Sequence, residues 1–191
     1  MPTKKYLFTS KRLGFRNWVD DDIPKMTKIS ANPKVMRFFP SVASPVQTQK
    51  FVLKMQHLCN DKKFCYFAVD RLEDATFIGF IGLCEQSYVA PFTPCIDIGW
   101  RLDESFWGNG YATEGAEACL KYAFNQLNIP KIYAIASEIN RPSIRVMEKI
   151  GMTKNCTFEH PKLLDTPNLK KCVCYEIEKG TVVADYLSKE V

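Results

Sequence analysis

The chain has 191 residues, of which 46% are hydrophobic and 25% are charged. This length and balance are those of one globular domain, and they exclude a disordered chain or a collagen-like repeat. The 26 basic and 21 acidic residues leave a net charge of +5. That excess is too small and too dispersed to indicate nucleic-acid binding, although it would suit an anionic ligand.

The eight cysteines are the unusual feature of the composition. Because they form no CxxC pair and no histidine lies at ligand spacing, we expect no metal site. Cys172 and Cys174 suit packing on one face of a strand. The longest apolar run, 77–84, is far too short to cross a membrane, and no signal-like segment follows the N-terminal lysines. We therefore expect reduced thiols and a cytoplasmic protein.

The first half of the chain alternates extended and helical patterns. Residues 7–18 are predicted to form a first strand, and three aspartates from position 20 favour a helix that runs to about residue 29. A second helix is predicted at 46–59. Three extended segments follow, joined by loops that favour antiparallel pairing: 64–69, 76–84 and 96–102.

The second half begins with a change of period. Small and apolar residues recur at helical spacing over 112–127, and a strand is predicted at 131–137. A short helix at 143–150 ends at Gly151, and two strands follow at 152–158 and 171–177. The order predicts an α/β (α+β) fold with a mixed, mostly antiparallel sheet of about seven strands and about four helices. We expect one domain, 1–191, with a core of about 7–179 and a short tail, 180–191.

A glycine-rich segment between a predicted strand and a predicted helix is the best candidate for binding an anion. Gly108 and Gly110 permit a tight turn and a close approach of the backbone to a ligand. The unpaired N–H groups at the start of the next helix suit a phosphate. The segment lacks the Gly-Lys-Ser/Thr of the P-loop and the third glycine of the dinucleotide fingerprint. A plain turn between strand and helix is the alternative.

A second polar segment precedes the helix at 143–150. Asn140 suits an N-cap and Pro142 a first helical turn, so capping alone would explain them. Ser143 follows directly. Together with the glycine-rich segment, in this order and spacing, this segment forms a combination that is specific enough to indicate a protein family.

The combination resembles the GNAT superfamily of acetyl-coenzyme A-dependent N-acetyltransferases, and within it the RimJ/RimL-like branch that includes acetyltransferases of ribosomal-protein N-termini. The resemblance covers about residues 7–179. Trp107 departs from the superfamily, which often has Arg or Gln at the first position of its phosphate loop. Phosphate binding is still expected, because the donors that matter there are main-chain N–H groups. Five segments carry the resemblance: 12–16, 77–83, 97–102, 107–114 and 140–152.

The resemblance implies acetyl-coenzyme A as co-substrate and no metal. Strand 97–102 would pair with the pantetheine arm and splay from strand 131–137, opening a slot for the thioester. Residues 108–113 would bind the pyrophosphate, Asn140 the pantetheine or an ordered water, and Ser143 would lie near the sulfur. The implied cofactor-binding residues are Ile98, Gly99, Trp100, Leu102, Trp107, Gly108, Asn109, Gly110, Tyr111, Ala112, Thr113, Asn140 and Ser143.

The implied reaction is direct attack of a neutral primary amine on the thioester in a ternary complex. An α-amine, with a pKa of about 8, is neutralised near pH 7 far more easily than a lysine at about 10.4. No Cys–His pair favours a covalent route. Asn140, Ser143 and Asp97 are the expected catalytic residues, with Ser143 giving a hydrogen bond or a proton to the departing sulfur. A main-chain N–H of residues 98–100 would bind the oxyanion.

The general base stays open among Asp97, Glu85 and Glu138, because each could instead be a solvated carboxylate at a strand end. His57 and His160 are expected on the surface or in packing. Four aromatic residues could line an acceptor pocket, although core packing is the default for this residue type: Trp18, Trp100, Phe38 and Phe39.

Protein N-termini are the favoured acceptors on this interpretation. Small amines such as polyamines or aminoglycosides are the alternative, and so is a non-catalytic coenzyme A-binding regulatory module. We expect neither a nucleic acid nor a membrane as partner, and either a monomer or a homodimer.

Overall fold

The computed structural model describes residues 6–181, so the predicted tail lies outside the described residues from position 182 onward. The strands are β1 (Phe8–Thr9), β2 (Leu13–Arg16), β3 (Tyr66–Arg71), β4 (Thr76–Gln86), β5 (Cys95–Leu102), β6 (Lys131–Ser137), β7 (Thr153–Glu159) and β8 (Lys171–Glu178). The α-helices are α1 (Asp22–Ser30), α2 (Pro33–Met36), α3 (Pro45–Lys62), α4 (Tyr111–Asn125) and α5 (Arg141–Lys149).

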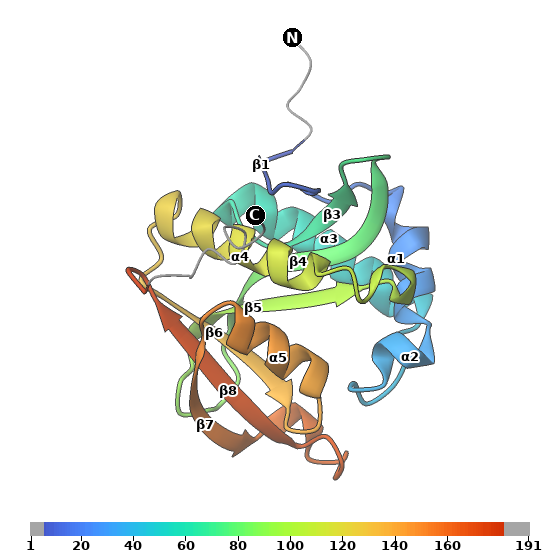
Figure 1. The fold of residues 1–191 in the computed structure, drawn as a ribbon. Helices are drawn as coiled ribbons and strands as arrows, with labels where there is room; N and C mark the ends of the chain where they lie inside the picture. The colour runs from blue at the N-terminus through green and yellow to red at the C-terminus, as the bar shows by residue number, and fades with distance from the viewer. Residues whose placement is uncertain (1–5, 182–191) are drawn as a thin grey trace.

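The eight strands form one sheet in the order β1-β2-β3-β4-β5-β6-β8-β7, and helices cover both of its faces (Figure 1). Every neighbouring pair is antiparallel except β5 and β6. The predicted α/β fold with a mixed, mostly antiparallel sheet is therefore confirmed. Within residues 6–181 it has one strand and one α-helix more than expected.

The extra strand comes from the N-terminal segment, where the prediction of one strand over 7–18 is wrong. The chain reverses between Thr9 and Leu13, so that β1 and β2 pair with Phe8 opposite Phe15. The Ser10 hydroxyl accepts a hydrogen bond from the Leu13 N–H inside this turn. One long strand and two short strands joined by a turn show the same alternation of polar and apolar residues. Only the turn distinguishes the two arrangements, and the alternation does not reveal it.

The extra helix, α2, lies between the two helices predicted in the first half of the chain, where no element was expected. The Asn32 side chain accepts from the Lys34 N–H at 2.9 Å, and Pro33 occupies the first helical position. Helix α3 begins with a capping box between Ser44 and Gln47 and runs three residues beyond its predicted end. The segment from α2 to the start of α3 lies beside β5, where Phe39 contacts Arg101.

The core lies on both faces of the sheet. Gly115 of α4 packs against Ile81 and Leu13 so closely that a Cβ there would lie 2.3 Å from the Ile81 side chain. On the opposite face, Phe51 of α3 packs against the rings of Tyr66 and Phe80. Side chains alternate along a strand, so the neighbours Phe80 and Ile81 serve different layers. All eight cysteines are free thiols, and six of them are buried.

A buried ion cluster fixes α1 to the sheet. Both carboxylate oxygens of Asp22 accept from the Arg16 guanidinium, at 2.6 and 2.9 Å, and both of Asp70 accept at 2.8 and 2.9 Å. Arg16 belongs to β2, Asp22 to α1 and Asp70 to β3. The N-cap residue of α1, Asp21, makes no side-chain capping hydrogen bond, so the cap expected from the three aspartates is absent. Asp22, in the first turn, is turned into the protein and binds Arg16.

We predict that Arg16→Met lowers the free energy of unfolding by about 3–5 kcal/mol, because it leaves two buried carboxylates without their counter-charge. Urea unfolding followed by fluorescence measures the change. The control is Lys170→Met, which removes a surface ion pair with Glu159 and should leave the midpoint near the wild-type value. Equal midpoints for both variants would contradict a structural role for the cluster.

Candidate active site

The sheet opens between its two parallel strands. β5 and β6 pair at one position only, with Asp97 opposite Tyr133, and they diverge from there (Figure 1). Beyond this point β6 remains paired with β8 along its length, while the side of β5 that faces β6 has no strand partner. A cleft of about 720 Å³ lies at this opening. The divergence implied by the family resemblance is therefore present.

A helix start with unpaired N–H groups forms one end of the cleft. Gly108 and Gly110 have φ angles of +78° and +77°, a region that favours glycine, and α4 begins at the next residue. The N–H groups of the first turn of a helix have no partner within the helix and point outward. A Cβ at Gly108 would meet nothing within 4 Å, so a ligand can approach the backbone there. This geometry fits a pyrophosphate.

Two side chains hold this loop in place. Glu114, in the first turn of α4, is buried and accepts from Ser10, from the Arg12 main chain and from Arg12 Nε, at 2.6 to 2.7 Å. Arg12 Nη2 also donates to the Asn109 carbonyl oxygen at 3.0 Å. The hairpin at the N-terminus therefore fixes a loop that is about 100 residues away in the sequence.

Of the predicted cofactor-binding residues, all but Asn109 line the cleft. The Asn109 side chain donates instead to the carbonyl oxygens of Phe106 and Trp107 and so stabilises its own loop. Trp107 donates its indole N–H to the Leu102 carbonyl oxygen at 3.0 Å, which fixes the indole at the end of β5.

The start of α5 faces the cleft from the β6 side. Asn140 Oδ1 accepts from the Ser143 N–H at 3.3 Å, so the predicted cap is present. Its Nδ2 has no hydrogen-bond partner among residues 6–181, and the same holds for the Ser143 hydroxyl. Both groups line the cleft and are free to bind a ligand. Capping and ligand binding are therefore compatible at Asn140.

Asp97 lies deep in the cleft, 8% exposed, at the position where β5 and β6 part. Tyr66 donates its hydroxyl to Asp97 Oδ1 at 2.7 Å, and Gln86 donates to the Tyr66 oxygen at 3.2 Å. Burial raises the pKa of Asp97 to about 6, against the lowering effect of the hydrogen bonds from Tyr66 and Gln86. A carboxylate with this pKa can take up a proton near neutral pH.

The other two candidate bases are placed differently. Glu85 is exposed at the end of β4 and forms an ion pair with Lys62. Glu138 pairs with Lys171 at 2.8 Å, and this pairing lowers the pKa of its carboxyl group. Neither lines the cleft, and Asp97 is the only acidic residue of the described chain that does.

Several lining residues were missed by the sequence analysis. Tyr66, Gln86 and Tyr88 come from β3, β4 and the loop after β4, and Arg101 lies two residues beyond Gly99 on β5. His160, expected on the surface or in packing, also lines the cleft and stacks on Tyr88 with ring centroids 4.4 Å apart. No local motif marks these positions, because strand pairing brings them together.

The aromatic candidates divide between core and cleft. Trp18 is buried and donates its indole N–H to the Tyr66 carbonyl oxygen, so it belongs to the core. Phe38, Phe39 and Trp100 line the cleft. His57 is exposed on α3, as expected.

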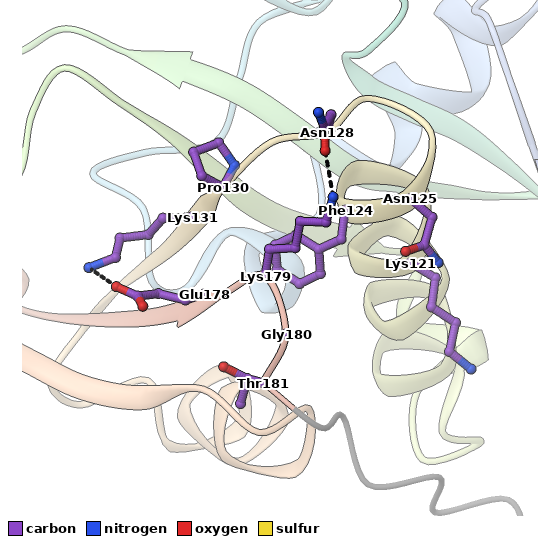
Figure 2. A pocket seen from close by; sticks show the side chains of 10 residues that line it. All are labelled: Lys121, Phe124, Asn125, Asn128, Pro130, Lys131, Glu178, Lys179, Gly180 and Thr181. Carbon is purple, nitrogen blue, oxygen red and sulfur yellow. Dashed lines mark hydrogen bonds and ion pairs between the residues drawn. The ribbon is translucent and has the colours of Figure 1, made fainter.

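A second hollow, of about 1110 Å³, lies at the far ends of β6 and β8 beside the last turn of α4. Its lysines are already engaged: Lys131 pairs with Glu178 at 2.8 Å and Lys179 donates to Asn128 (Figure 2). It contains neither a buried carboxylate nor a free helix start, so it offers no comparable chemistry. Residues 6–181 contain no cluster of metal-binding side chains and no helix long and apolar enough to cross a membrane.

Comparisons with known proteins agree with this geometry. Residues 12–153 match the model of the acetyltransferase (GNAT) domain family. An uncharacterized N-acetyltransferase of Bacillus subtilis, YnaD, is 29% identical over 79% of this chain and 85% of its own length. The crystal structure of a GNAT-family acetyltransferase from Bacillus anthracis has a TM-score of 0.75, with 27% identity over 90% of this chain and 97% of that one.

More distant structures share the fold and differ in their substrates. RimL, a ribosomal α-N-protein acetyltransferase solved with coenzyme A, is 18% identical with a TM-score of 0.73, over 90% of this chain and 97% of its own. Spermidine N-acetyltransferase from Vibrio cholerae, solved with coenzyme A and spermine, is 19% identical with a TM-score of 0.70, over 88% and 96%. At this identity the likeness shows the fold alone.

We predict that Gly110→Val weakens coenzyme A binding at least tenfold, measured by titration calorimetry. A β-branched residue cannot readily adopt a φ of +77°, so the loop and its N–H groups would move. Gly180→Val is the matched control, because Gly180 also has a positive φ and open space around it but lies at the second hollow. Equal affinity in both variants would show that the loop does not bind the cofactor.

Proposed function

Since the chain belongs to the acetyltransferase (GNAT) family, we propose that it moves the acetyl group of acetyl-coenzyme A to a protein N-terminal α-amine by direct attack. Membership of this family establishes that the chain is an acetyl-coenzyme A-dependent acyltransferase. The observation that carries the rest is one open cleft with an anion-binding loop at one end and a single buried carboxylate, Asp97, further in. A merely coenzyme A-binding module would have no use for that carboxylate.

The cofactor is held along β5 on this proposal. The loop from Gly108 to Thr113 binds the pyrophosphate through main-chain N–H groups. The unpaired edge of β5 beyond Asp97 is available to pair with the amide groups of the pantetheine arm. Asn140 donates its free Nδ2 to the same arm from the opposite wall of the cleft.

Four events then complete the transfer. The amine nitrogen attacks the thioester carbonyl carbon, and a main-chain N–H of residues 98–100 binds the negative charge that develops on the carbonyl oxygen. Asp97 takes a proton from the attacking nitrogen. The carbon–sulfur bond breaks, and Ser143 gives its hydroxyl proton to the departing sulfur. Asp97 then releases its proton to water and Ser143 takes one up, so both groups return to their starting states. The products are an amide and free coenzyme A.

Two observations favour an α-amine over a polyamine. An α-amine with a pKa of about 8 needs only a weak base, and a buried carboxylate with a pKa of about 6 is suited to that task. The charged residues that line the cleft include the cations Lys34, Arg37, Arg101 and Lys162. A ligand with several positive charges would be repelled there.

Free thiols and the use of acetyl-coenzyme A fit a cytoplasmic enzyme.

We predict that kcat/KM with a fixed peptide acceptor falls as pH is lowered through about 6, because Asp97 must be ionised to take up a proton. Asp97→Asn should lower kcat/KM by about 10²–10⁴-fold at pH 8 and abolish this acidic limb. Release of free thiol measures the rate. Glu85→Gln, at an exposed carboxylate outside the cleft, should retain the wild-type profile. A limb near pH 6 that persists in Asp97→Asn would exclude Asp97 as the base, whereas the limb from the acceptor amine itself, with a pKa of about 8, is expected in both enzymes.

We predict that Ser143→Ala lowers kcat by at least tenfold and leaves the KM for acetyl-coenzyme A within about threefold, because the hydroxyl acts on the departing sulfur. Single-substrate kinetics at saturating peptide measure both constants. Ser143→Thr keeps a hydroxyl and should recover part of the rate. If Ser143→Ala turns over at the wild-type rate, another group protonates the sulfur.

A further inference from the structure

Arg101 lies on the wall of the cleft without a full set of partners. It sits opposite Phe80 in the pairing of β4 with β5, and it lines the cleft. Its Nη1 donates to the Ser30 hydroxyl at 3.3 Å, which is a long bond. Its Nε is buried and has no hydrogen-bond partner. A guanidinium has five N–H donors, so most of the hydrogen-bonding capacity of this group is unused.

No carboxylate of residues 6–181 forms an ion pair with this guanidinium. Its close neighbours are aromatic: the guanidinium carbon is 4.4 Å from the centre of the Phe39 ring and 5.4 Å from that of Phe80. Ring faces attract a cation but cannot accept its N–H bonds in the plane of the guanidinium. Burial lowers the pKa of Arg101 to about 10, which reflects how poorly its charge is compensated.

The position of Arg101 assigns it to the acceptor side of the cleft. Ser30 ends α1, and Phe39 lies between α2 and α3, so its contacts come from the helices on the face opposite α4. The phosphate-binding loop instead begins α4, after the end of β5. Asp97, Gly99 and Arg101 share one face of β5, because side chains alternate along a strand. The proposed base and the unpaired guanidinium therefore face the same acceptor.

From this arrangement we propose that the acceptor carries a carboxylate near its amine and that Arg101 binds this carboxylate through its free N–H donors. The proposal rests on the acetyltransferase function proposed above. Asp97 and Arg101 are four residues apart on one strand, so their Cα atoms are about 13 Å apart. An extended peptide needs about four residues to cover that span, and fewer where the Arg101 side chain or an acidic side chain of the peptide reaches along it. The carboxylate would then be an acidic side chain at positions two to four of a peptide, or the terminus of a short one.

The charge of the surrounding wall supports this assignment. Arg37 and Lys162 lie along the same cleft, and Asp97 is the only acidic residue of the described chain that lines it. Lys34 also lines the cleft, but it is paired with Glu104 at 3.4 Å. A carboxylate entering here meets an excess of positive charge. A planar guanidinium binds a carboxylate through two parallel hydrogen bonds, which a neutral amide side chain cannot reproduce.

The test compares peptides that begin with alanine and carry Glu, Gln or Lys at positions two to four. Free-thiol release by the full-length wild-type enzyme should give a kcat/KM for the Glu peptide at least tenfold above that for the Gln peptide. Arg101→Met should bring the two values within about twofold, mainly by raising the KM of the Glu peptide. The dipeptide Ala-Glu and free glutamate form a second arm: rates equal to the long Glu peptide identify a small acidic amine as the source of the carboxylate.

Arg145→Met is the matched control, because Arg145 is exposed on α5 and does not line the cleft. It should keep the wild-type preference. Calorimetry with coenzyme A should give the same affinity for Arg101→Met as for the wild type, and urea unfolding should give an equal or higher midpoint, because no counter-ion is left unpaired. Loss of coenzyme A affinity in Arg101→Met would assign the residue to the cofactor and overturn the proposal.

The two proposals fail in different ways. If no peptide or small amine, spermidine included, stimulates thiol release, the transferase proposal itself is wrong. If peptides are acetylated but Glu, Gln and Lys sequences react equally, or if Arg101→Met keeps a preference for Glu, the function stands and the role of Arg101 is refuted.

Discussion

The parallel contact between β5 and β6 is the constraint on which the rest of the structure depends. A parallel pair needs a crossover connection, and α4 supplies it by packing against β4 and β5. β6 is matched residue by residue with β8 from Lys131 to Ser137, but with β5 only at Asp97. The sheet therefore opens at its one parallel joint, where the crossover helix begins and its unpaired N–H groups point to the opening.

On the function proposed above, one strand would serve both substrates as a consequence of this opening. The main chain of β5 is free along its edge, and its side chains alternate between the two faces of the sheet. Gly99 shows how closely the acceptor face is packed, since a Cβ there would lie 3.1 Å from the Tyr66 ring. Asp97 and Arg101 flank this glycine. The strand thus places a carboxylate and a guanidinium at a fixed separation, while its edge beyond Asp97 has no strand partner among residues 6–181.

What the sequence could predict follows from the range of the interactions involved. The loop around Gly108 and Gly110 and the cap at Asn140 are local patterns, and both appear in the structure as expected. The choice among Asp97, Glu85 and Glu138 depended on strand register and on distant lysines, which no local pattern reveals. The turn between β1 and β2 was not predicted for the same reason. Its Ser10 side chain is held partly by Glu114, which is more than a hundred residues away in the sequence.

Arg16 and Arg101 are two arginines that differ in how well their charges are compensated. Arg16 donates four hydrogen bonds to two carboxylates and therefore stabilises the junction of sheet and helix. Arg101 has one long hydrogen bond and, within residues 6–181, no counter-ion. Asp97 is equally unfavourable for the fold: its pKa rises from 3.8 to about 6 on folding, so its ionised form costs stability, on the order of 2–3 kcal/mol, above pH 6. This cost decreases as the pH falls from about 6 toward 3.8, because the folded state then binds a proton that the unfolded state does not. The two cleft groups whose burial is unfavourable for the fold are the two that an acceptor with an amine and a carboxylate would satisfy.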